Sequence, residues 1–127
     1  MNAVCTVTNT NRAALPVPTS ETDYAKISAN LEGTLLLIPT FISEAEALVG
    51  QSADKAELTA KWISFEKSDF AAIKPIAQRM VDASKAKDSA KVKKIGAELD
   101  AAPNHSEAMA RFMTTYGLTA CANLETS

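Results

Sequence analysis

Metal chemistry in this chain would have to start from His105, because it is the only histidine in the sequence. The two cysteines, Cys5 and Cys121, lie near opposite ends of the chain. Zinc and related ions need three or four nitrogen, sulfur or carboxylate ligands gathered at one point. The sequence therefore predicts no metal centre, and it contains no motif for a cofactor.

Nucleophilic chemistry is suggested only by two short matches. Residues 52–55 and 64–67 fit the Ser-x-x-Lys pattern of penicillin-recognising enzymes, but the companion motifs are absent and 127 residues are too few for that fold. The neighbouring carboxylates Glu44 and Glu46 are two residues apart and would point to different sides of a helix. Four scattered glycines leave no glycine-rich phosphate loop. We therefore expect a protein that is not an enzyme.

Charge gives two weaker signals. The formal net charge of -2 does not favour nucleic acid as a partner. Lysines gather at residues 85–94, where they could touch anionic lipid, a wall polymer or an acidic protein, or could simply form a solvated turn. The charged residues within 21–49 are all acidic except Lys26, which suggests charge complementarity between neighbouring helices.

The spacing of apolar residues predicts the elements that carry these side chains. In residues 21–49, 54–87 and 88–116, apolar positions recur alternately three and four residues apart, which is typical of amphipathic helices. Gly50 and Gly117 would end the first and third of these helices. Ser20 is the expected N-cap of the first.

Short links between the predicted helices require neighbours to run antiparallel. We therefore predict an all-α fold, an up-and-down antiparallel helical bundle forming a single domain over residues 1–127. Residues 1–19 would run back along the bundle as an N-terminal segment, either extended or as a short helix.

Each long helix contains one proline, Pro39, Pro75 or Pro103, and the apolar pattern stays in register across all three. This continuity predicts kinked helices rather than breaks. Kinks near the middle could bow the helices apart around a small apolar pocket, or could only wrap them around a filled core. The pocket would be lined by Ile38, Phe41, Ile73, Ala77, Leu99, Ala102 and Met109.

The predicted topology would let Cys5 reach Cys121, because residues 6–19 can span the length of a helix when extended. Two unrelated free thiols are the alternative. A disulfide would indicate an oxidising compartment. The longest apolar run, residues 35–38, is far shorter than the roughly 20 residues of a membrane span, so no transmembrane segment is expected. No signal peptide is visible, so the protein is cytosolic or has lost a signal that preceded Met1.

Three features carry a resemblance: Cys5 followed by Leu15-Pro16 and Pro18-Thr19, Trp62 early in the second long helix, and the ending that runs from Tyr116-Gly117-Leu118 to Cys121. In these the chain resembles small exported helical-bundle proteins and lipoproteins of actinobacteria, most of them uncharacterised. The resemblance implies an all-helical, disulfide-closed domain exported to the cell envelope. It supplies no catalytic residues. Residues 6–11 are rich in threonine and asparagine, and they look less helical than the corresponding segment of similar proteins.

The expected function is therefore a non-enzymatic, exported binding or interaction module of the cell envelope, extracellular or envelope-associated. Its alternative is a carrier of a small hydrophobic ligand in the pocket near the prolines. The partner would be an unknown protein or such a ligand, and a lipid anchor on the native precursor stays open.

Overall fold

A computed structural model describes residues 1–126, and in this part of the chain every regular element is a helix. The predicted all-α, antiparallel bundle closed by one disulfide is confirmed. The elements are α1 (Asn2–Ala13), α2 (Tyr24–Gly50), α3 (Lys55–Leu58), the π-helical turn η1 (Thr59–Ile63), α4 (Ser64–Lys85), α5 (Ser89–Ala101), α6 (Ser106–Thr115) and α7 (Thr119–Thr126).

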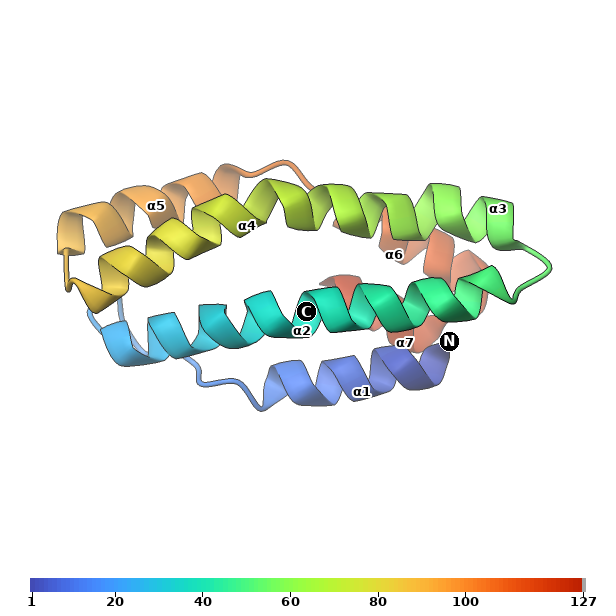
Figure 1. Ribbon diagram of the computed structural model, residues 1–127, viewed down its shortest axis with the longest axis horizontal. Helices are drawn as coiled ribbons and strands as arrows, with labels where there is room; N and C mark the ends of the chain where they lie inside the picture. Colours follow the sequence, from blue (N-terminus) through green and yellow to red (C-terminus); the bar gives the residue numbers. More distant parts are fainter. Residues whose placement is uncertain (127) are drawn as a thin grey trace.

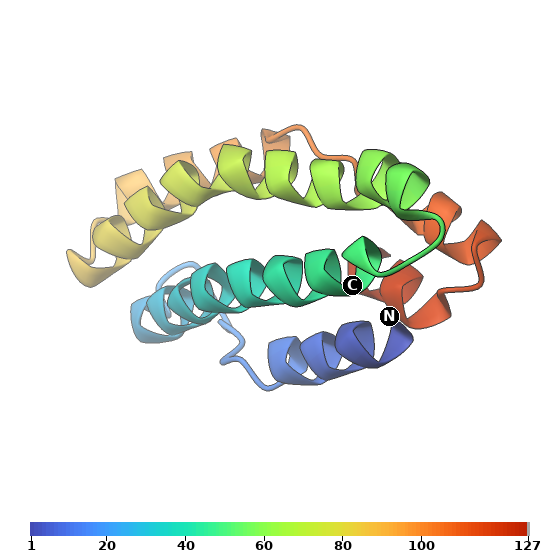
Figure 2. The same cartoon turned by 45° about the vertical axis from the view of Figure 1, so that its right-hand side comes forward.

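The long axis of the molecule is a hairpin of α2 against the continuous rod made by α3, η1 and α4 (Figure 1). Both prolines in this hairpin lie inside helices that continue past them, as predicted for Pro39 and Pro75. Figure 2 shows the rod curving along its length over α2. Ion pairs of Glu32 with Lys85 and of Glu46 with Lys67 join the two arms, which confirms the charge complementarity expected between helices.

The start of α2 differs from the prediction. The helix begins at Tyr24, and its N-cap residue is Asp23 rather than Ser20. The Asp23 carboxylate accepts hydrogen bonds from the backbone N–H and the hydroxyl of Thr19. The Ser20 hydroxyl instead forms hydrogen bonds with the backbone N–H and the hydroxyl of Thr22. The chain therefore makes one more turn of loop before the helix starts.

The predicted helix over residues 88–116 is wrong, because the chain leaves the helix at Pro103. α5 ends at Ala101, and Ala102 is extended with φ -62° and ψ 129°. A residue that precedes proline is disfavoured in the α-helical region because of a clash with the proline ring. α6 then starts at Ser106, so two helices replace one.

The predicted stop at Gly117 is confirmed, but a further helix follows it. Gly117 has φ +84°, which a residue without Cβ adopts cheaply. Leu118 N–H donates to the Met113 carbonyl across this turn at 2.8 Å, so the chain reverses and continues as α7. α7 carries Cys121 back against α1.

Residues 2–13 are helical, which settles the choice that the sequence left open. The hydroxyls of Thr6 and Thr10 donate to backbone carbonyls one turn earlier, so the threonines do not compete with the helix. The linker from α1 to α2 is held closely, because Leu15 packs where a Cβ on Gly33 would lie. Asn30 of α2 also donates to the Pro16 carbonyl at 2.9 Å.

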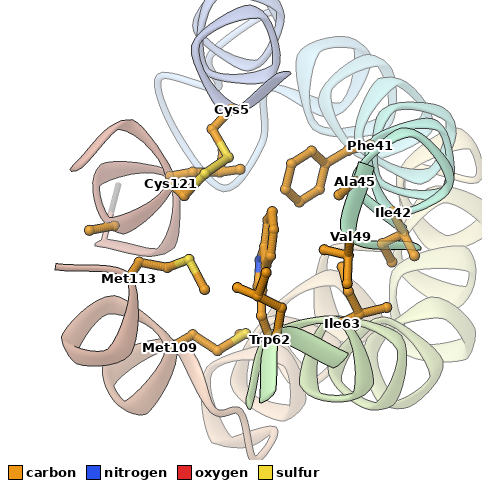
Figure 3. Close-up of a cluster of buried hydrophobic side chains, with 13 residues drawn as sticks. Cys5, Phe41, Ile42, Ala45, Val49, Trp62, Ile63, Met109, Met113 and Cys121 are labelled. Carbon is orange, nitrogen blue, oxygen red and sulfur yellow. A yellow bond between two sulfur atoms is a disulfide. The ribbon is translucent and has the colours of Figure 1, made fainter. Parts of the chain in front are cut away.

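The disulfide joins Cys5 of α1 to Cys121 of α7, 116 residues apart in sequence. Both cysteines are buried in the larger of two hydrophobic cores, which fills the end of the bundle where α2 meets α3. Figure 3 shows Trp62 in the middle of this core, between Phe41 and the methionines Met109 and Met113.

A second, smaller core lies at the opposite end, where α4 turns into α5. Its buried residues are Ile27, Met80, Ala83, Val92 and Ile95. The two cores share no buried residue.

By length and composition, α2 is the one helix within residues 1–126 that could cross a membrane. Its most apolar 18-residue window has a mean hydropathy of 1.3, and 22% of that window is buried. The core helix of a soluble protein satisfies the same criteria, so the absence of a transmembrane segment stays a prediction.

Candidate functional site

A cavity of about 290 Å³ lies between α2 and α4, beside the larger core. α2 and α4 form its apolar wall, with one contribution from α6. Ile38 and Phe41 come from α2, Phe70 and Ile73 from α4, and Met109 from α6. The wall is completed by Leu37 of α2 and Leu124 of α7.

The structure gathers part of the pocket predicted from the prolines. Ile38, Phe41, Ile73 and Met109 line the cavity together. Ala77, Leu99 and Ala102 do not line it. Leu99 packs instead against the smaller core, and Ala102 lies in the extended link after α5. The prediction placed Leu99, Ala102 and Met109 on one stripe of a single kinked helix, and the break at Pro103 divides that stripe.

The predicted pocket was lined by apolar residues alone, whereas the cavity also has a polar side. α1 contributes Thr8 and Arg12, α4 contributes Glu66 and Asp69, and α7 contributes Glu125. Thr34, Asn104 and Ser106 complete this polar side. Glu66 and Asp69 flank the apolar positions Phe65 and Phe70 in sequence, which could have been noticed. Glu125 gave no signal, because no helix was predicted after Gly117.

Glu66 and Glu125 place two carboxyl groups side by side across the α4–α7 junction. Burial, and after it the hydrogen bond with Glu66 and the charge of Glu66, together raise the pKa of Glu125 to about 10. Arg12 acts in the opposite direction on this pKa. At neutral pH the Glu125 carboxyl is therefore protonated and shares its proton with Glu66.

Arg12 connects the polar side of the cavity to the chain ends. Its Nη2 donates to the Leu124 carbonyl at 2.8 Å and to Asn9 Oδ1 at 3.4 Å. Asn9 in turn donates to the Ala120 carbonyl at 3.1 Å. These bonds hold α7 on α1 and thereby hold Glu125 against α4.

His105 is part of the scaffold of the site. Its backbone N–H donates to Asp69 Oδ2 at 2.7 Å, and its Nδ1 lies 2.6 Å from Asp69 Oδ1. The ring also stacks on Phe65, with the centroids 4.2 Å apart. Both oxygens of Asp69 are thus engaged in fixing the start of α6, and Glu66 and Glu125 remain as the carboxyl groups that face the cavity.

The other candidate regions give less support for a functional site. Within residues 1–126, no three histidine, cysteine or acidic side chains are grouped so that they could hold a metal ion. The lysine-rich turn forms a hollow at the α4–α5 end, but acidic residues share its walls, among them Asp82, Asp88 and Glu98. Lys91 pairs with Asp88 there, so the region is of mixed charge.

Comparison with protein-family models, with curated proteins and with solved structures found no match for this chain. The geometry of the cavity is accordingly the basis for a functional interpretation.

The raised pKa of Glu125 predicts that stability falls as pH rises. The folded protein keeps a proton that the unfolded chain releases above about pH 4.3, so the loss extends from there to about pH 10. Between pH 5 and pH 7 we expect this group to lower the free energy of unfolding by about 2 to 3 kcal/mol. Glu125→Gln should remove this part of the slope in urea titrations at the two pH values. Glu107→Gln, at an exposed carboxylate of α6, should leave it unchanged.

Proposed function

We propose that the protein is a non-enzymatic binding module of the cell envelope that takes a small ligand with an apolar body into the cavity beside Phe41 and Ile73. The observation that carries the proposal is the cavity itself. At about 290 Å³ it lies at the lower end of the range for small-molecule sites, and such sites are mostly apolar with a few placed polar groups.

The cavity is also built on elements that are fixed relative to one another. The disulfide ties α1 to α7, and the Asp69 contacts with His105 tie α4 to the start of α6. A preformed site spends less of its binding free energy on ordering its own walls. This fixed arrangement supports the interpretation of the cavity as a binding site rather than as a packing defect between the two cores.

Export to the envelope is the second part of the proposal. Disulfides persist in oxidising compartments and are rare in the cytosol, and this one is buried. The resemblance of the chain to exported helical-bundle proteins of actinobacteria supports the same location. An extracellular module of this size would present the cavity to small molecules outside the cell.

A filled cavity should no longer bind. The change is Ile73→Trp, which places a larger side chain on the cavity wall, and the probe is hexanol measured by isothermal titration calorimetry. We expect saturable binding of hexanol to the unmodified protein and a loss of at least about tenfold in affinity in Ile73→Trp.

The matched control is Leu36→Trp, which adds the same indole on the outer face of α2, where Leu36 is 75% exposed. It should bind hexanol within about twofold of the unmodified protein. Absence of saturable binding to the unmodified protein, or equal losses in the two variants, would overturn the proposed site. Circular dichroism of both variants checks that the helices are intact.

A further inference from the structure

The polar side of the cavity points to the chemical class of the ligand. We infer that the ligand carries a protonated amine at one end of its apolar body, and that the amine binds between Glu66 and Glu125 while the apolar body lies against Ile38, Phe41 and Ile73. This inference rests on the proposed function, since it requires the cavity to be a binding site.

The first argument is an unused acceptor. Glu66 Oε1 is buried, and apart from the proton that the Glu66 carboxyl shares with Glu125 it has no hydrogen-bond partner among residues 1–126. A buried acceptor that is left unpaired costs about 1 to 3 kcal/mol, and more if it is charged. Glu66 lines the cavity, so a donor on a ligand could reach this side of it. An ammonium group supplies three donors and no acceptor, which suits a site made of carboxyl oxygens.

The second argument is the balance of charge around the cavity. The titratable groups that line it are Arg12 of α1, Glu66 and Asp69 of α4, and Glu125 of α7. The His105 ring contacts Asp69, and the lining residues from α2 are all uncharged. Carboxyl groups thus outnumber the guanidinium along the cavity lining, where Glu66 and Glu125 remain after His105 has engaged both oxygens of Asp69. Arg12 already donates to Leu124 and Asn9.

This balance disfavours an anionic ligand. A carboxylate brought against Glu66 and Glu125 would be repelled, and it would need Arg12 to leave the carbonyl that holds α7 in place. A neutral ligand would leave the acidic pair sharing a proton. An ammonium group provides the positive charge that lets the Glu125 carboxyl ionise beside Glu66, because an opposite charge within a few ångströms favours the charged form.

The geometry also separates the two ends of such a ligand. The carboxyl groups lie on α4 and α7, whereas Ile38 and Phe41 come from α2. The site therefore matches a molecule with one cationic end and one apolar end. A ligand that is cationic throughout would bury charge against Ile38 and Ile73, which is unfavourable.

Three probes with the same alkyl chain distinguish the alternatives: hexylamine, hexanol and hexanoate, each titrated into the protein at pH 7 by calorimetry. We expect hexylamine to bind at least about tenfold more tightly than hexanol, and hexanoate to bind most weakly. Glu66→Gln and Glu125→Gln should each bring hexylamine to within about threefold of hexanol, with little change for hexanol itself. These variants keep the shape of the side chain, and Glu44→Gln on the exposed face of α2 is the control.

The outcomes separate the inference from the function on which it rests. If hexanol and hexylamine bind equally well to the unmodified protein, the cavity is a site and the amine is wrong. If Glu44→Gln weakens hexylamine as much as Glu66→Gln does, the attraction is a general surface effect and the amine site is again overturned. If none of the three probes binds, the proposed function fails and this inference fails with it.

Discussion

Replacing both cysteines, as Cys5→Ala together with Cys121→Ala, is expected to lower the free energy of unfolding by about 4 to 5 kcal/mol. The bond closes a loop of 116 residues, so in the chain-entropy model it removes a large part of the freedom of the unfolded chain. For a domain of this length the loss corresponds to a fall of roughly 15 °C in Tm. Urea and thermal unfolding followed by circular dichroism measure both quantities.

The structure gives a second reason for a large effect. α1 and α7 are short helices at the two ends of the chain, and besides the disulfide they are held by side-chain bonds such as those of Asn9 and Arg12. Short isolated helices are marginal in water, so their stability depends on this contact. Without the bond we expect α1 and α7 to separate first, and the cavity to lose its polar side.

Reduced but unsubstituted protein is the natural control, because it keeps both sulfur atoms in the core. It should be destabilised by nearly as much as the double variant if the crosslink dominates. A loss below about 1 kcal/mol in both would contradict the prediction. Alkylation of intact source cells before lysis adds the test of export, since a protein exposed to an oxidising compartment should present no reactive thiols at Cys5 and Cys121.

The parts of the fold that could be predicted from sequence are those fixed by local pattern. The three-four spacing of apolar residues is sufficient to place α2 and the rod through α4, because one apolar stripe must face a partner over the whole length. Proximity of Cys5 to Cys121 follows from the topology of antiparallel helices joined by short links. These features need no knowledge of which side chains meet.

The break at Pro103 could not be predicted in this way. Pro39 and Pro75 lie in the same kind of pattern, yet their helices continue. At Pro103 the broken ends find new partners: Asn104 Oδ1 accepts from the backbone N–H of Ser106, and Asp69 accepts from that of His105. Satisfying these amides offsets the helical bonds that are lost. The decisive partner, Asp69, is distant in sequence.

The candidate site shows the same division. Its apolar wall comes from positions on the helical stripes and was predicted in part. Its polar side depends on α7 folding back after Gly117. This reversal brings Glu125 to Glu66, which lies 59 positions earlier in the sequence. No periodicity within either segment carries that information. The chemistry of the cavity is therefore a property of the closed fold.

Trp62→Ala is expected to lower the free energy of unfolding by about 4 kcal/mol, close to the effect of losing the disulfide. Trp62 is fully buried at the centre of the larger core, and its ring centroid lies 6.1 Å from that of Phe41. The π-helical turn η1 contains it and lets both Trp62 and Ile63 face inward, with exposed fractions of 0% and 2%. Truncation to alanine would leave a large cavity among residues that the disulfide keeps from collapsing.

Trp62→Phe should cost much less, about 1 to 2 kcal/mol, for a reason specific to this site. The indole Nε1–H is buried without a hydrogen-bond partner among residues 1–126, so the native state already bears the penalty of an unpaired donor. Phenylalanine loses part of the packing but removes that penalty. Urea unfolding followed by circular dichroism compares the two variants. Equal losses for alanine and phenylalanine would contradict this account, because they would show that the buried donor costs nothing and that the second ring of the indole carries the packing.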